Sequence, residues 1–141
     1  MAVAIMSDSL SKKEITINSS VENLSYVERE IESVFVDFSF SQDHFGNVLI
    51  AVTEAVNNAV HYGNQEDVTK VVNIGFATQK NQLIVTIKDE GDGFDYEALP
   101  DPTDPENIEK LQGRGIFLMK HLSDSIAFSD NGSKVEMVFN F

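Results

Sequence analysis

The stretch Val48-Leu-Ile-Ala-Val-Thr-Glu-Ala-Val-Asn-Asn-Ala-Val-His-Tyr-Gly63 predicts one amphipathic helix. Its apolar residues recur at steps of three and four positions, which places them in a single stripe on the helix surface. The stripe consists of Val48, Val52, Ala55, Val56, Ala59 and Val60. We expect Gly63 to end the helix in a left-handed cap, a conformation that glycine adopts without steric cost.

The polar residues of this helix lie on another face. Glu54, Asn58 and His61 occupy positions i, i+4 and i+7, and Asn57 lies at the edge of the same face. No Lys or Arg occurs between residues 51 and 65. A carboxylate, two amides and an imidazole are better suited to holding a cation or a polar ligand than to forming a solvated surface. The alternative interpretation is a helix end whose amides face a turn.

The composition argues against several classes of protein. A length of 141 residues favours one domain, and the lack of Cys leaves no disulfide and no cysteine zinc site. The formal net charge of −13 argues against direct binding to nucleic acid, which requires a basic surface. The apolar opening Met-Ala-Val-Ala-Ile-Met is too short for a signal peptide or a membrane span. We therefore expect a cytoplasmic protein without direct membrane contact.

The order of the predicted elements indicates an α+β fold. Strands are expected over residues 14–18, 70–77, 83–88, 125–129 and 135–141. A capping box at Ser19-Ser-Val-Glu22 precedes the first helix, and Ser41 is expected to cap the second. The order β-α-α-β-β-loop-α-β-β predicts a two-layer α/β sandwich. We expect a flexible tail at residues 1–12 and a single domain at residues 13–141.

Two glycine-containing motifs follow the long helix. Asp89-Glu-Gly-Asp-Gly-Phe94 comes directly after an apolar strand, and its glycines allow a tight turn and the close approach of a flat ligand. The Asp89 carboxylate can accept a hydrogen bond from an exocyclic amine. Gly113-Arg-Gly-Ile116 precedes a short helix, where backbone N–H groups and Arg114 favour a phosphate. Taken singly, the first motif also fits an ordinary turn, and the second a loop-to-helix junction.

The segment between these motifs has a different composition. All three prolines of the chain lie within residues 95–112, together with several acids. A loop of this length inside a compact domain is typically a lid, a binding loop or a disordered segment. We expect residues 95–112 to form a lid.

Together these segments predict a nucleotide site with a divalent cation. Mg²⁺ takes oxygen ligands and keeps several waters, so one protein oxygen together with phosphates can suffice. Asn58 is the candidate metal ligand through its Oδ1. Glu54 lies one helical turn away and could act as a base on a water or hydroxyl aligned with the terminal phosphate.

The ordered set of motifs resembles that of the Bergerat-fold (GHKL) ATPases, which include histidine kinases, type II topoisomerases, the large heat-shock chaperone and mismatch-repair proteins. Residues 54–59 are similar to their asparagine box, residues 89–94 and 113–116 to their two glycine boxes, and residues 132–135 to a final Gly-Thr-x-Val segment. The chain most resembles the small anti-sigma regulatory factors that are also serine-protein kinases. The resemblance runs from about residue 14 to the C-terminus, although the Pro- and Asp-rich residues 100–105 depart from the expected lid.

The resemblance implies a fold and a role for each matched residue. The Bergerat fold packs its helices on one face of a mixed, mostly antiparallel sheet. Asn58 would hold Mg²⁺, Glu54 would be the general base, and Asp89 would accept a hydrogen bond from the adenine amino group. The remaining nucleotide-binding residues would be Gly91, Gly93 and Phe94 around adenine, Gly113, Arg114, Gly115 and Ile116 around the phosphates, and Ser133 at the threonine position near adenine. For His61, a packing or capping role and a ligand role both remain open.

The resemblance also implies an activity and partners. We expect an ATP-dependent protein-serine kinase that phosphorylates an anti-sigma-factor antagonist of the STAS type and sequesters a sigma factor. Two alternatives stay open at this point. One is a nucleotide-gated partner switch without catalysis, and the other is a detached histidine-kinase-like ATPase domain of a phosphorelay. A homodimer is compatible with the resemblance and with the apolar stripe around Phe35 and Phe38.

Overall fold

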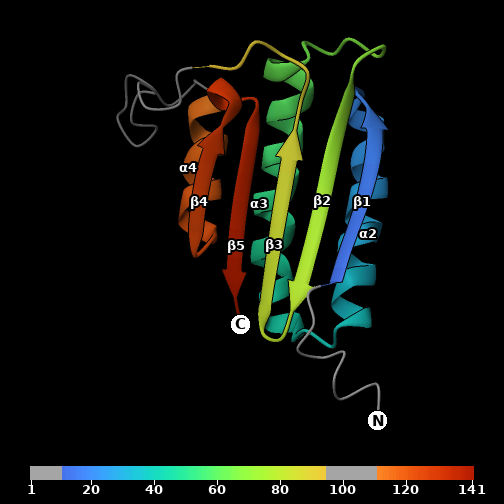
Figure 1. Ribbon diagram of the computed structural model, residues 1–141, viewed down its shortest axis with the longest axis vertical. Coiled ribbons are helices and arrows are strands. Elements are labelled where there is room, and N and C mark those ends of the chain that lie inside the picture. The colour runs from blue at the N-terminus through green and yellow to red at the C-terminus, as the bar shows by residue number, and fades with distance from the viewer. Residues whose placement is uncertain (1–10, 95–110) are drawn as a thin grey trace.

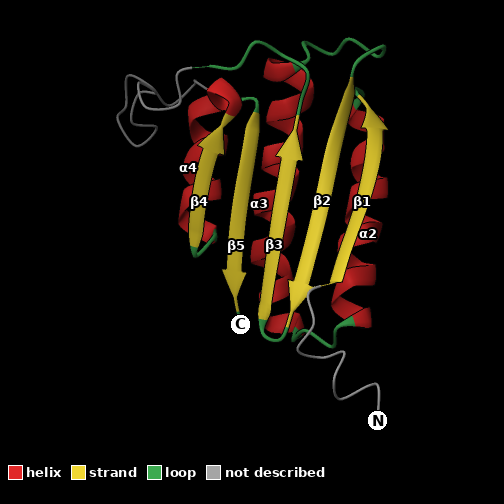
Figure 2. Ribbon diagram, in the orientation of Figure 1, coloured by secondary structure: helices red, strands yellow, loops and turns green. Residues whose placement is uncertain are grey.

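The computed structural model describes residues 11–94 and 111–141 as a sheet covered by helices on one face (Figures 1 and 2). The strands are β1 (Ser11–Asn18), β2 (Val71–Gln79), β3 (Gln82–Lys88), β4 (Ser125–Ser129) and β5 (Lys134–Asn140). The α-helices are α2 (Leu24–Asp37), α3 (Phe45–Asn58) and α4 (Leu111–Leu122). Short helical turns are η1 (Val21–Asn23), η2 (Gln42–His44), the π-helical η3 (Ala59–Gly63) and η5 (Asp130–Gly132). The predicted order of strands and helices is confirmed.

The sheet has the strand order β1-β2-β3-β5-β4, and each pair of neighbouring described strands is antiparallel. The expectation of a mixed sheet was therefore wrong for the described strands. The two helices between β1 and β2 reverse the chain three times, so β2 returns antiparallel to β1. Only one helix, α4, lies between β3 and β4 in the chain, so these two strands run in the same direction. They are not neighbours, because β5 lies between them in the sheet (Figure 1).

The core lies between the sheet and the helices. Alternate strand residues point towards the helices and are buried, as the period of a pleated strand requires. The central part of this layer consists of Ile15, Ile17, Val72, Ile74, Phe76, Leu83, Val85, Ile87, Val135, Met137 and Phe139. The apolar stripes of α2 and α3 complete it from the other side, with Ile31, Phe35, Val48, Val52 and Val56 among the buried residues.

The observed boundaries correct several expectations. β1 begins at Ser11, so residues 11 and 12 belong to the sheet and not to a tail, while residues 1–10 lie outside the described residues. The first helical segment is capped by Ser20, whose Oγ accepts a hydrogen bond from the Glu22 N–H. Ser19, the expected cap, is buried and bonded elsewhere. The β2–β3 turn is shorter than expected, because Asn81 adopts a left-handed conformation (φ 60°).

Within the described residues, no helix has the length and apolar character needed to cross a membrane. Most of the expected lid, residues 95–110, lies outside the described part of the chain. Its last two residues form the start of α4.

Candidate functional site

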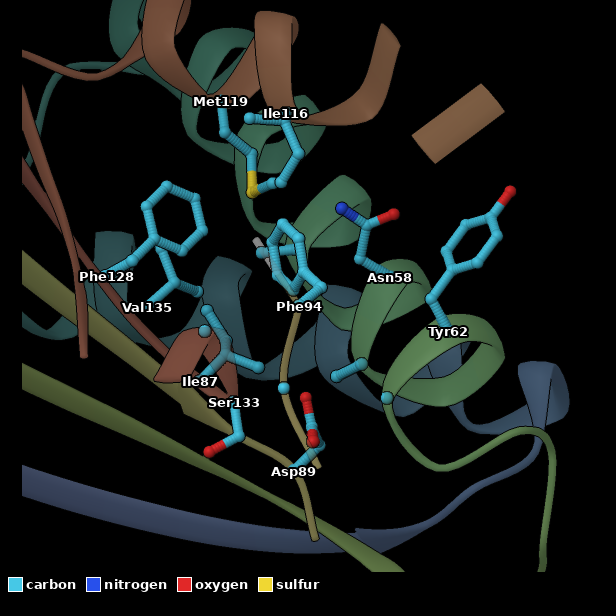
Figure 3. A pocket seen from close by; sticks show the side chains of 15 residues that line it. Asn58, Tyr62, Ile87, Asp89, Phe94, Ile116, Met119, Phe128, Ser133 and Val135 are labelled. Atoms are coloured by element: carbon cyan, nitrogen blue, oxygen red, sulfur yellow. The ribbon is translucent and has the colours of Figure 1, made fainter. Parts of the chain in front are cut away.

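A small, mostly apolar cavity lies between α3, α4 and the end of the sheet (Figure 3). It brings together residues from the long helix, the first glycine motif and the C-terminal strands, which are far apart in the sequence. The lining residues are Ala55, Asn58, Ala59, Tyr62, Gly63, Ile87, Asp89, Gly93, Phe94, Ile116, Met119, Phe128, Gly132, Ser133 and Val135. Six of the predicted site residues are thus in one place: Asn58, Asp89, Gly93, Phe94, Ile116 and Ser133.

The open space in this cavity is small, about 40 Å³. Ligand pockets commonly measure roughly 300–1,000 Å³. Figure 3 shows the reason, because the ring of Phe94 projects into the middle of the lining residues. This ring contacts Phe128 edge-to-face at a centroid distance of 5.8 Å. The space is therefore too small for a flat heterocycle in this conformation, and Phe94 is the last described residue before the segment 95–110.

Asp89 directly follows β3 and is the one acid among the described residues of the cavity wall. Its backbone N–H donates to the Ser133 carbonyl at 2.9 Å, and its Oδ1 accepts from the Gly91 N–H at 2.8 Å. Only 9% of the residue is exposed. Burial raises the pKa of the Asp89 carboxyl above its ordinary 3.8, and the Gly91 N–H and nearby lysines only partly oppose this shift. A buried carboxylate with a free oxygen is suited to accepting a hydrogen bond from a ligand amine.

Glycines allow the walls of this cavity to approach one another. A Cβ on Gly91 would lie 2.1 Å from the Gly63 carbonyl oxygen, and a Cβ on Gly93 would lie 2.0 Å from the Asn131 carbonyl oxygen. Gly93 also has a positive φ of 86°, which disfavours other residues. The Phe94 N–H donates to the Asn131 carbonyl at 2.8 Å. The first glycine motif is thus packed backbone to backbone against η3 and against the β4–β5 turn.

A second, polar cavity lies on the other side of Asn58. It is lined by Glu54, Asn57, Asn58, His61, Tyr62, Glu66, Arg114, Gly115 and Leu118 and measures about 610 Å³. The predicted polar face of the helix is therefore confirmed as one surface, and α4 lies opposite it. His61 Nδ1 is 3.4 Å from Glu66 Oε2, and this contact is an ion pair only when the imidazole is protonated.

Asn58 belongs to both cavities, and its amide has unused bonding capacity. In Figure 3 its nitrogen points towards the side of Ile116 and its oxygen towards the side of Tyr62. Asn58 Nδ2 and Asn57 Oδ1 are buried, and neither has a hydrogen-bond partner among the described residues. Such unpaired buried groups are costly, and this arrangement is suited to a site that a polar ligand completes.

Gly115 shows why the second motif contains glycine. A Cβ there would lie 3.0 Å from Glu54 Oε2 and 3.5 Å from Asn58 Oδ1, so the carboxylate and the amide converge on its backbone. Gly113 and Gly115 lie inside α4, which begins at Leu111, and not in a loop before the helix as expected. The glycines are consistent with close packing of α4 on α3, while Arg114 is exposed and lines the polar cavity.

Two further expectations about single residues are corrected. Gly63 does not form a left-handed cap, since the positive φ angles after the helix occur at Gln65 and Glu66. α3 instead continues into the π-helical η3, and a Cβ on Gly63 would lie 2.3 Å from the Asp89 carboxyl group. Ser133 lines the cavity, but its Oγ donates to the Asp130 carbonyl at 2.9 Å and points away from Asp89 (Figure 3).

Several residues of the apolar cavity carry no sequence signal of a binding role. Met119 follows the second glycine motif in the predicted short helix, and Phe128 belongs to the predicted strand 125–129. Both are apolar residues at regular spacing, so no sequence signal separated them from the core. Tyr62 gave no signal beyond its place beside His61.

The donor set of the polar cavity fits a magnesium ion that is bound mainly by its substrate. Within residues 11–94 and 111–141, no group of three His, Cys, Asp or Glu side chains could hold a metal. The carboxylate and amide oxygens at Gly115 are nevertheless the ligand types that Mg²⁺ prefers. An ion held here would have to take most of its ligands from phosphates and water.

Comparisons with known proteins agree with this geometry. Residues 17–139 match the family model described as the histidine kinase-like ATPase domain. The serine-protein kinase RsbW of Staphylococcus aureus strain bovine RF122 / ET3-1 is 31% identical over 132 residues, covering 88% of this chain and 83% of the relative. The protein of the same name from strain MRSA252 matches to the same extent.

A solved structure also matches the fold. A crystal structure of RsbU and RsbW domains from Mycobacterium tuberculosis superimposes with a TM-score of 0.63 over 92% of this chain, at 13% identity. This chain spans about a third of that solved chain, namely 32%. The expected two-layer α+β fold and the expected family are both confirmed. The chain therefore belongs to the histidine kinase-like ATPase family and is a relative of the serine-protein kinase RsbW.

Proposed function

We propose that this chain is an ATP-binding anti-sigma regulatory factor with protein-serine kinase activity. The observation that supports this function best is the pair of cavities joined at Asn58. One is apolar and contains the buried carboxylate of Asp89, and the other is polar and contains Glu54 and Arg114. A nucleotide has the same division, with a flat apolar base at one end and charged phosphates at the other.

The base occupies the apolar cavity once Phe94 has moved aside. The free oxygen of Asp89 accepts a hydrogen bond from the 6-amino group of adenine, which distinguishes adenine from a base with a carbonyl at that position. Ile116 and Met119 contact the ring from α4. Because Gly91 and Gly93 have no side chains, the turn after β3 lies close enough to the neighbouring backbone to form this wall.

The phosphates extend past Asn58 into the polar cavity. Gly113, Gly115 and Arg114 face them from α4, and the guanidinium of Arg114 supplies positive charge. Asn58 Oδ1 would hold Mg²⁺, which would supply charge neutralisation on the phosphate oxygens and help align them. Ser133 reaches the nucleotide only if its hydroxyl turns away from the Asp130 carbonyl.

Glu54 acts as the general base of the transfer. Its carboxylate takes the proton from the serine hydroxyl of the substrate protein, and the serine oxygen forms a bond to the γ-phosphorus. The bond between that phosphorus and the β–γ bridging oxygen breaks, so ADP leaves with that oxygen. Glu54 lies beside Asn58 because the two residues are one helical turn apart on α3.

The partners are a STAS-type antagonist, which provides the serine, and a sigma factor, which the protein sequesters in the cytoplasm. The described residues 11–94 and 111–141 belong to the ATP-binding domain, and the protein can assemble as a homodimer. The strongly acidic net charge of −13 suits a basic protein surface as partner and argues against nucleic acid.

The experiment that tests this function uses γ-labelled ATP, Mg²⁺ and a purified STAS-type antagonist. A serine kinase produces acid-stable label on a serine of the antagonist. Label that is acid-labile and lies on histidine would instead indicate a phosphorelay domain. Tight ATP binding without any labelling would indicate a nucleotide-gated switch that lacks catalysis.

Asn58→Ala tests the metal role separately. We expect calorimetry to show weaker ATP binding in the presence of Mg²⁺, while the weak binding of metal-free ATP changes little. Equal losses with and without Mg²⁺ would contradict the assignment of Asn58 as the metal ligand.

A further inference from the structure

Asn64 is fully buried directly after η3, and its side chain joins three other segments of the chain. Its Oδ1 accepts a hydrogen bond from the Glu90 N–H at 2.7 Å. Its Nδ2 donates to the Oγ of Ser19 at 2.8 Å and to the Val71 carbonyl at 2.9 Å. One amide therefore connects the end of β1, the start of β2 and the turn after β3.

The groups around Asn64 are themselves bonded to one another. The Ser19 Oγ donates to the Lys70 carbonyl at 2.8 Å. The Val71 N–H donates to Glu90 Oε2 at 2.6 Å, so Glu90 is held by both its backbone and its side chain. The backbone N–H of Asn64 donates to the Ala59 carbonyl at 2.8 Å, which fixes Asn64 to the π-helical turn.

Gly63, the residue before Asn64, packs directly against the turn after β3 that contains Asp89 and Gly91. A Cβ on Gly63 would lie 2.3 Å from Asp89 Oδ2, and a Cβ on Gly91 would lie 2.1 Å from the Gly63 carbonyl oxygen. The Asp89 carboxylate therefore lies between the Gly63 backbone and the Gly91 N–H, from which its Oδ1 accepts a hydrogen bond. Its direction depends on where Gly63 and Glu90 are held, and Asn64 holds both.

We propose that Asn64 is a positioning residue for base recognition, because its amide fixes the Gly63 backbone against the Asp89 carboxylate. This inference rests on the proposed function, since it assumes that Asp89 contacts the adenine amino group. The residue that fixes the Gly63 backbone, Asn64, lies outside the first glycine motif.

The chemistry of the site requires an amide at this position. The side chain must present one acceptor to the Glu90 N–H and two donors to Ser19 and Val71. A carboxylate has no donor for the Val71 carbonyl and would bury a charge, while alanine would leave these backbone groups unpaired. Only the asparagine geometry satisfies all three partners from one short side chain.

The test compares the binding of ATP and of inosine triphosphate, which has a carbonyl oxygen in place of the 6-amino group, by calorimetry with Mg²⁺. In Asn64→Ala we expect the preference for ATP to fall by about tenfold. Ser19→Ala removes one partner of the amide and should give a smaller loss of the same preference. Asn23→Ala is the control, because it removes an exposed amide whose Nδ2 donates to the Asn18 carbonyl. It should leave the preference unchanged.

Binding of Mg²⁺ and tripolyphosphate gives the readout that separates positioning from general damage. It should stay within about twofold of wild type in both variants, because tripolyphosphate has no base for Asp89 to recognise. A preference for ATP that is unchanged in Asn64→Ala would overturn the inference, and so would an equal loss for all three ligands. If Asn64→Ala does not fold, the ATP preference of Ser19→Ala decides, and an unchanged preference in that variant would overturn the inference. A wild-type protein with no preference for ATP would instead count against the proposed function itself.

Discussion

The two cavities that meet at Asn58 are built in opposite ways. The apolar cavity is shaped by backbone, because Gly63, Gly91 and Gly93 bring main-chain segments into contact and the Asp89 carboxylate has a hydrogen-bond donor in place. The polar cavity is shaped by side chains, including those of Asn57 and Asn58, and each of these two amides has one buried atom without a hydrogen-bond partner among the described residues. Packed backbone therefore forms much of the first cavity, whereas charged and amide side chains form much of the second. Changes to the first should therefore affect stability and base binding, and changes to the second should affect chemistry.

The largest expected effect is on catalysis in the polar cavity. Glu54→Ala should reduce phosphotransfer to the antagonist by about 10²–10⁴-fold, because the general base is lost. Its affinity for ATP should stay close to that of wild type, since Glu54 repels the phosphates more than it binds them. Initial rates of labelled transfer and calorimetry measure the two quantities. Glu136→Ala, an exposed acid on β5, is the matched control, and phosphotransfer that continues at the wild-type rate in Glu54→Ala would rule out the role.

A backbone change in the apolar cavity should mainly cost stability. Gly93→Ala places a Cβ against the Asn131 carbonyl oxygen and forces alanine into a positive φ. We expect the free energy of unfolding in urea to fall by about 3 kcal/mol. Gly46→Ala is the control, because no heavy atom lies within 4 Å of a Cβ added at this position on α3. Its free energy of unfolding should rise by up to about 1 kcal/mol. Similar results for the two variants would contradict the backbone account of this cavity.

Asp89→Asn separates base binding from stability within the apolar cavity. The amide would turn a donor towards the adenine amino group, so ATP affinity should fall by about 10- to 100-fold. The free protein should be no less stable near neutral pH, because the variant no longer buries a carboxylate whose pKa is raised by burial. Calorimetry and urea unfolding test the two expectations. A loss of stability together with unchanged ATP affinity would assign Asp89 a purely structural role.

The smallest expected effect is a pH dependence. The pKa of Asp89 is raised above 3.8 in the folded protein, so its contribution to stability is present below 3.8 and is lost as the pH rises through the raised pKa. Base binding has the opposite dependence, because it favours the ionised carboxylate. ATP affinity should therefore fall severalfold as the pH is lowered through the raised pKa. Asp89→Asn is the control, since the phosphates of ATP titrate equally in both proteins, and parallel pH profiles would contradict this expectation.

The comparison of the cavities also explains which sequence predictions succeeded. The polar face of residues 54–61 follows from helical spacing alone, and the structure places Glu54, Asn58 and His61 at one cavity. The strand order along the chain follows from alternating apolar residues and turn signals. These patterns are local, and their period is fixed by backbone geometry.

The errors concern features that depend on distant residues. Gly63 was expected to cap a helix and Gly115 to lie in a phosphate-binding loop before one, but their small size also matters because Asp89 and Glu54 approach them from other elements. Asn64 gave no signal, because its three partners lie on segments that meet only after folding. A mixed sheet was expected, but β5 lies between β3 and β4, so the two strands that run in the same direction are not neighbours.

The sequence by itself determined the elements, their order, the family and the chemical types present at the site, because these depend on local spacing and on motifs within short segments. Only the tertiary structure decided that the apolar and polar cavities share Asn58, that Phe94 occupies the space expected for a base, and that Asn64 holds the turn containing Asp89. The physical reason is that close packing and buried hydrogen bonds join residues that are far apart in the chain, and no local periodicity records such contacts.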